Sequence, residues 1–253
     1  CSTSTNSMSS PTPTLTTKGI GTDPFYALSL ANGASLATDV QTTNSLTISS
    51  ATLSLGGKNL SVGANLRGAG PLLATAAEAT AVDADSPPTA FTRATRTLTL
   101  NGASPANLGG LSLYNLVINK AAQANTVTST AALTVTNSLS LTRGTWAAAS
   151  YSHSIAGGWN SSAAAFSFSC GTSTIAMSSP NPTLTTKGIG TDPFYNLTLS
   201  NGGTLASALQ TSTNLSLSAG TLSLAANTLS VGATLSGAGA LTASASEAIS
   251  VGG

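Results

Sequence analysis

The chain has 253 residues, of which 6% are charged and 4% aromatic, and its formal net charge is +1. An ordinary soluble domain has about 25% charged residues. The few lysines and arginines are scattered rather than clustered, so the sequence offers no basic patch for nucleic acid. No run of 18 apolar residues occurs, so we expect no membrane-spanning helix. With 41% hydrophobic residues, the chain differs from charged disordered chains and can form a packed core.

An internal repeat dominates the sequence. Residues 170–253 align with residues 1–84 without a gap, and 51 of the 84 paired positions are identical. A repeat of this length without an insertion indicates a periodic architecture in which each residue has a fixed place. It favours a structural or adhesive role over catalysis, because an enzyme needs one site whereas a fibre needs many equal units. We therefore expect that the protein is not an enzyme.

Short runs in which apolar and polar residues alternate predict β-strands along the chain. Examples are Leu28-Ser-Leu30, Leu46-Thr-Ile48 and Leu53-Ser-Leu55, and alternation at a period of two is typical of a half-buried strand. Glycine and asparagine separate these runs and favour turns. Serine, threonine and glycine are abundant and are poor or indifferent helix formers, so the sequence predicts an all-β protein.

The spacing of leucines predicts how the strands are arranged. Two series of inward leucines advance by steps of 7, 7, 6 and 6 residues, which suits a solenoid with three short faces and about 18–21 residues per coil. About a dozen coils at about 4.8 Å give a rod on the order of 60 Å long. The expected fold is a right-handed parallel β-helix. The predicted core positions are Leu46, Leu53, Leu60, Leu66, Leu72, Leu215, Leu222, Leu229, Leu235 and Leu241.

A finer repeat divides the chain further. Leu113-Tyr-Asn-Leu-Val-Ile118 resembles Phe194-Tyr-Asn-Leu-Thr-Leu199. We therefore expect one elongated solenoid over residues 1–253, with internal units at about 1–88, 89–169 and 170–253.

A ten-residue block from Thr17 to Tyr26 recurs letter for letter from Thr186 to Tyr195. The glycines of the block are expected to turn the chain, and each aspartate precedes a proline, which favours an extended conformation. The alternative is an interface that recurs once in each unit. The predicted turn residues are Gly19, Gly21, Asp23, Pro24, Gly188, Gly190, Asp192 and Pro193.

Two cysteines, Cys1 and Cys170, are too few for a disulfide framework. They are equivalent residues of the two copies, so a straight stack holds them too far apart for a bond within one chain. They are expected to be buried thiols or to pair with cysteines of another molecule. A lipid anchor on Cys1 is a further alternative, which the equivalence with Cys170 disfavours.

The remaining chemically distinctive residues give no catalytic, metal or cofactor site. Asp83 and Asp85 form the only close acidic pair, in a predicted turn, and the single histidine, His153, is expected at the surface or in a turn. One histidine and two distant cysteines cannot supply a zinc site. Trp146 and Trp159 stand where other units have leucine, which favours core packing in a wider coil, with a ligand-stacking platform as the alternative.

The succession of Phe-Tyr-Asn-Leu-Thr-Leu, Leu-Ser-Leu-Ser-Ala-Gly-Thr-Leu and Asn-Thr-Leu-Ser-Val-Gly resembles the repeats of bacterial surface and secreted proteins of the filamentous-haemagglutinin and autotransporter-passenger type. The resemblance is one of pattern over nearly the whole chain. It implies a right-handed parallel β-helix outside the cell, with adhesion, surface coating or fibre formation as the usual roles. The low charge departs from that pattern and favours lateral packing of neighbours.

The expected function is that of a structural subunit of an extracellular fibre, sheath or surface layer, which assembles end to end with copies of itself or with continuing repeats of the same chain. The alternatives are an adhesin or glycan-binding module, for which Trp146, Tyr151 and Trp159 offer the only aromatic groove, an enzyme that acts on polysaccharide, and an ice-binding protein with threonine ladders. The sparse carboxylates disfavour the enzyme.

Overall fold

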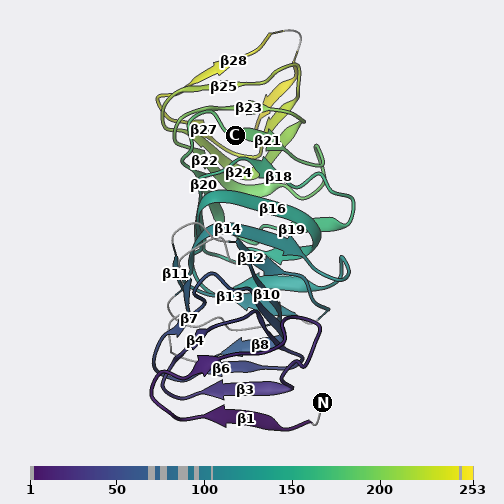
Figure 1. Cartoon of the computed structure of the whole chain (residues 1–253). Coiled ribbons are helices and arrows are strands. Elements are labelled where there is room, and N and C mark those ends of the chain that lie inside the picture. Colours follow the sequence, from purple (N-terminus) through teal and green to yellow (C-terminus); the bar gives the residue numbers. More distant parts are fainter. Residues whose placement is uncertain are drawn as a thin grey trace.

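The computed structural model describes residues 3–67, 72–74, 79–84, 91–93, 97–103, 105–244 and 247–252. These residues form a β-solenoid of about 11 turns from parallel strands, and none of them is helical. Figure 1 shows the turns stacked along one axis, from β1 at one end to β28 at the other. The prediction of an all-β parallel solenoid is confirmed.

Each turn places one strand on each of three faces, which we name in chain order. The first face holds β1 (Thr5–Met8), β3 (Ala27–Leu30), β6 (Leu46–Ile48), β13 (Ala106–Leu108), β15 (Thr126–Ser129), β19 (Phe166–Ser169), β26 (Leu229–Val231) and β29 (Ile249–Val251). The second holds β2 (Thr14–Leu15), β4 (Ala34–Leu36), β7 (Leu53–Ser54), β9 (Leu72–Ala74), β11 (Phe91–Arg93), β17 (Ser152–Ile155), β20 (Thr174–Met177) and β27 (Leu235–Ser236). The third holds β5 (Val40–Thr42), β12 (Thr97–Leu100), β18 (Trp159–Asn160), β21 (Thr183–Thr185), β23 (Gly203–Leu205), β25 (Thr221–Ser223) and β28 (Ala240–Thr242). The remaining strands turn a corner and serve two or three faces: β8 (Leu60–Arg67), β10 (Ala79–Ala84), β14 (Ser112–Asn119), β16 (Thr134–Ala147), β22 (Phe194–Leu199) and β24 (Leu209–Leu217).

Strand register fixes the length of a turn. Near the start of the chain Leu46 pairs with Leu66. The sequence separation of this pair lies within the range of about 18–21 residues per turn that the leucine spacing predicts. In the middle of the chain the paired positions lie farther apart in sequence, and Trp159 pairs with Leu184. The expected turn length is therefore too short for the middle turns, which also enclose bulky tryptophan, histidine and phenylalanine side chains.

Alternation along the strands sends apolar side chains inward to one core that runs from Leu15 to Val231. Eight of the ten leucines named from the sequence are at most 2% exposed, and the other two, Leu235 and Leu241, are half-buried and pack against the same core. Fully burying one leucine side chain contributes about 1.5–3 kcal/mol. The leucine series winds around the three faces, one residue per strand, so that Leu46 pairs with Leu66 and Leu53 with Leu72 a full turn away.

The two copies of the repeat occupy different faces. The ladder of third-face strands that starts at Val40 continues by direct pairing, turn after turn, to Leu139. Beyond Leu139 the chain continues to place one strand on each face in turn. Leu209, which is the counterpart of Val40, therefore lies on the first face, where its strand pairs with β26 and β26 pairs with β29. The shift between the two copies therefore spans a whole number of turns plus one face. Equivalent surface groups of the two copies consequently point in different directions.

Within the described residues, no helix has the length and apolar character needed to cross a membrane.

Candidate functional site

The most regular surface feature is a loop that occurs twice, at residues 16–24 and 185–193, which we call the repeat loop. In the first copy the Thr17 hydroxyl donates to the backbone oxygen of Asp39 at 2.6 Å, and the Gly21 N–H donates to Gln41 Oε1 at 2.8 Å. Gly19 and Gly21 have φ angles of 96° and 88°, which glycine adopts without strain. These bonds tie the loop to the next turn of the solenoid.

The second copy of the repeat loop has the same internal geometry. The Thr186 hydroxyl donates to Ala208 O at 2.6 Å, and the Gly190 N–H donates to Gln210 Oε1 at 2.6 Å. Gly188 and Gly190 have φ angles of 90° and 86°. Because the two loops belong to different faces and different turns, their common shape is a property of the block itself.

The aspartates of the repeat loop overturn one prediction. We expected Asp23 and Asp192 to be extended because each precedes a proline, Pro24 or Pro193, but their φ angles are 53° and 51°. Aspartate is one of the few side chains that tolerate this left-handed region. In both copies its carboxylate forms an ion pair of 3.0 Å with the lysine at the start of the loop, which stabilises the turn.

An isoleucine stands at the tip of each repeat loop. Ile20 and Ile189 are 46% and 45% exposed and lie between two glycines. Among the described residues they belong to a small set of exposed large apolar side chains, which otherwise includes only Ile249 and Val251 of β29. Single exposed apolar side chains of this kind are common at protein surfaces and do not by themselves mark a binding site.

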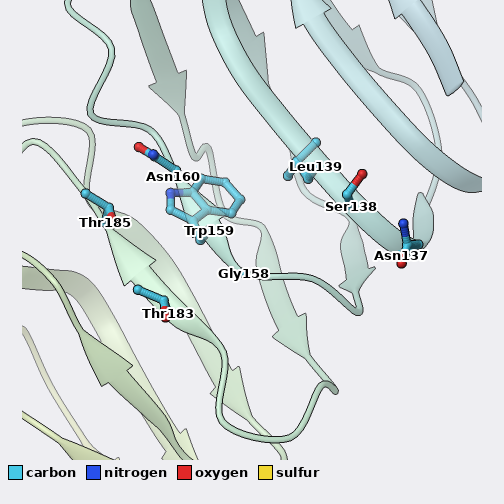
Figure 2. A pocket seen from close by; sticks show the side chains of 8 residues that line it. All are labelled: Asn137, Ser138, Leu139, Gly158, Trp159, Asn160, Thr183 and Thr185. Carbon is cyan, nitrogen blue, oxygen red and sulfur yellow. The ribbon is translucent and has the colours of Figure 1, made fainter.

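A polar groove opens on the third face between β16 and β18, where the strand ladder is interrupted. No backbone pairing joins these two strands among the described residues, although both pair with other strands. Two adjoining hollows of about 320 and 330 Å³ lie there, and both are lined by Leu139 and Asn160. Figure 2 shows Trp159 of β18 and Leu139 of β16 on either side of this opening, with Asn160 and Ser138 next to them on the same two strands. No charged side chain lines either hollow.

The tryptophans do not form an exposed aromatic platform. Trp146 and Trp159 are 0% and 1% exposed, and their rings stack at a centroid distance of 5.9 Å. Phe168 and Phe194 complete the cluster, with Phe194 4.7 Å from Trp159. Each indole N–H donates to a serine hydroxyl inside the core. The hypothesis of an exposed aromatic groove is therefore wrong, and Tyr151, half-buried, is the only member left near the surface.

The prediction for His153 is also wrong. The side chain is 1% exposed and points inward from β17, where Nδ1 accepts the Leu133 N–H at 3.1 Å and Nε2 lies 3.0 Å from Ala148 O. Both ring nitrogens are satisfied when Nε2 carries the proton, so the neutral ring fits the core. Burial lowers the pKa of His153, while the bond to Ala148 opposes that shift. The missed signal was the alternation, since His153 is in phase with the inward Ile155.

The cysteines and the acidic pair give no reactive centre. Cys170 is half-buried and forms no disulfide, and burial raises the pKa of its thiol, with a further contribution from the charge of Asp192. Cys1 and Asp85 lie outside the described residues, as does the side chain of Asp83. In the described part of the chain, no three histidine, cysteine, aspartate or glutamate side chains gather in a group that could hold a metal ion.

The comparisons with known proteins add no relative. A scan against protein-family models, a search of curated proteins and a search of solved structures each found no match to this chain.

Proposed function

We propose that the protein is a structural subunit of an extracellular fibre, sheath or surface layer, of the kind seen in bacterial secreted and surface β-solenoids. The observation that carries the proposal is the continuous apolar core from Leu15 to Val231 inside a coat of serine and threonine. Such a rod gains its stability from contacts between neighbouring turns, so further turns can be added with the same kind of contacts. A rigid, extensible rod is what a fibre requires.

The surface supports association between rods. Only 6% of all residues are charged, and part of that charge is used inside the molecule, because Lys120 is buried and the ion pair of Lys187 and Asp192 is largely covered. A surface with little net charge has weak repulsion to keep neighbouring molecules apart. We therefore propose lateral packing of the rods in addition to growth along the axis.

Electron microscopy and fibre diffraction of the purified chain test this function. We expect bundles of filaments. Each filament should show a repeat near 4.8 Å along its axis, because successive turns are about one strand spacing apart. Lysine at the exposed third-face positions Thr183 and Thr221 should separate the bundles through charge repulsion while leaving single filaments intact. Serine at the same two positions is the matched control. Isolated short rods at every protein and salt concentration would refute the proposal.

A second function, binding of a neutral glycan, is favoured by the groove between β16 and β18. Its lining combines side-chain amides and hydroxyls with an apolar floor and contains no charge, which suits uncharged sugars. A glycan array with the native chain and with Thr185→Lys, which places a long side chain in the groove, tests this function. Absence of binding by the native chain would exclude it.

A further inference from the structure

Four Asn-x-Ser/Thr triplets without a central proline occur in the chain, and they start at Asn59, Asn160, Asn196 and Asn214. This triplet is the acceptor sequence for attachment of a sugar to the amide nitrogen of the asparagine. In a chain rich in serine and threonine such triplets arise by chance, so the surroundings of each asparagine decide whether it can react. The structure separates one of the four from the other three.

The amide nitrogens of three of these asparagines are engaged in hydrogen bonds. Asn59 Nδ2 donates to Asp39 Oδ2 at 3.1 Å, and Asn214 Nδ2 donates to Asn196 Oδ1 at 2.9 Å. Asn196 Nδ2 donates in turn to Thr174 Oγ1 at 3.4 Å. All three asparagines are half-buried, and the residue that follows each of them is a core leucine. Their amide nitrogens are therefore not free to react with a sugar donor.

Asn160, at the end of β18, is exposed and has a different set of hydrogen bonds. Its Oδ1 accepts the Ser162 N–H at 3.1 Å and the Ser162 hydroxyl at 2.7 Å. Because a backbone N–H can only donate, the amide atom that faces it is the oxygen, and Nδ2 points away from Ser162. Among the described residues, none accepts a hydrogen bond from Asn160 Nδ2.

The central residue of this triplet holds the arrangement in place. Ser161 is buried, its N–H donates to Thr185 O at 2.9 Å, and its hydroxyl accepts the indole N–H of Trp159 at 3.0 Å. The two outer residues, Asn160 and Ser162, are both exposed. The triplet therefore presents a free amide nitrogen to solvent on a backbone that is fixed to the core.

The groove beside Asn160 has room for a sugar. Asn160 lines both of its hollows, of about 320 and 330 Å³, and Ser162 lines the second. These volumes lie in the range of about 300–1,000 Å³ that is typical of small-ligand sites. Ser140 and Thr142 of β16 are exposed and line the second hollow, so their hydroxyls can bind the hydroxyls of a sugar. A sugar on Asn160 can therefore lie along β16, where the strand ladder is interrupted.

We propose that Asn160 is a site of N-linked glycosylation and that the attached sugar occupies the groove between β16 and β18. Nδ2 forms a bond to the anomeric carbon of a glycosyl phosphate donor, the bond from that carbon to the phosphate oxygen breaks, and one amide proton passes to a base of the transferase. The donor is a sugar linked to a nucleotide or to a lipid pyrophosphate. The inference goes beyond the structural role and does not depend on fibre formation.

Transfer of sugar to the purified, folded chain tests the site. One arm uses a soluble glycosyltransferase specific for Asn-x-Ser/Thr with UDP-glucose, and the other uses an oligosaccharyltransferase with a lipid-linked oligosaccharide, so the arms distinguish the two donors. Glycopeptide mass spectrometry should find the sugar on Asn160 in at least one arm and not on Asn59, Asn196 or Asn214. Short peptides with each triplet are the control, and all four should be modified because they have no folded structure.

Two variants check the assignment. Asn160→Gln should lose all modification, whereas Ser162→Thr, which keeps the hydroxyl, should retain it, and circular dichroism checks that both variants keep their strands. A folded chain that stays unmodified at Asn160 in both arms, although the peptide is modified, would overturn the proposal. Equal modification of all four asparagines in the folded chain would also overturn it, because the hydrogen bonds would then not select the site.

Hydrogen exchange tests where the sugar lies. In the modified chain, amides of residues 138–142 should exchange more slowly than in the unmodified chain, because the sugar covers the edge of β16 that lines the groove. Amides of residues 214–217, outside the groove, should not change. Unchanged exchange at residues 138–142 would overturn the placement of the sugar. Microscopy of Asn160→Gln tests the fibre separately, because that variant lacks the sugar.

Discussion

At the scale of single residues, the core accepts a histidine and two tryptophans, and each of their ring nitrogens has a hydrogen-bond partner. His153 replaces an apolar inward side chain because its two nitrogens meet one backbone donor and one backbone acceptor. The indole N–H groups of Trp146 and Trp159 are also paired, because each donates to one serine hydroxyl. An unpaired polar group in such a core would cost about 1–3 kcal/mol, so these bonds are what make the wide middle turns possible.

The buried histidine makes stability depend on pH in a defined direction. Because the pKa of His153 is lowered in the folded state, the unfolded state takes up the proton first as the pH falls below about 6.5. The free energy of unfolding should therefore decrease below that pH and level off once the pH passes the folded-state pKa. Urea unfolding of the native chain and of His153→Gln between roughly pH 7.5 and 5.5 measures the difference. Identical pH profiles for the two proteins would contradict this account.

At the scale of elements, the repeat loop shows how one sequence acquires two environments. Its hydrogen bonds to the next turn are the same in both copies, and so are its backbone angles. The copies differ in that β19 covers the base of the second loop, where the Ser167 hydroxyl donates to Asp192 Oδ1. The ion pair of the second copy is therefore largely covered, whereas that of the first copy is exposed. The two copies of the loop therefore allow the effect of burial on the strength of one salt bridge to be measured within a single chain.

Removal of the aspartate should have unequal effects in the two copies. Asp192→Ala leaves Lys187 covered without its anion and takes away the acceptor of the Ser167 hydroxyl, so we expect a loss of about 2–4 kcal/mol in the free energy of unfolding. Asp23→Ala breaks an exposed pair and should cost at most about 1 kcal/mol. Chemical denaturation of both variants makes the comparison, and equal losses would show that the covering strand contributes nothing.

At the scale of the whole molecule, the solenoid is continuous in its core but not in its hydrogen bonding. The third face is interrupted between β16 and β18, where the turn lengthens and the polar groove opens. The described third-face strands before and after the interruption pair with their neighbours. Stability in a stacked array depends on contacts between adjacent turns, so this interruption is the expected weak point of the rod.

Hydrogen exchange should locate that weak point. Amides of residues 138–142 at the edge of the groove should exchange faster than those of residues 214–217, of which Leu215 and Ser216 pair with strands on both sides. Mass spectrometry of peptides that cover the two segments gives the comparison within one sample. Equal protection of both segments would mean that the groove is closed in solution.

The sequence by itself determined the class of fold, because strand alternation and the step between inward leucines are local properties that a short window reveals. It also located the repeat loop as a turn. Only the tertiary structure decided which face each copy occupies, that His153 is internal, and where the third-face ladder is interrupted. These features depend on the lengths of all the preceding turns together and on which strands stack on one another. A local sequence pattern does not contain that information.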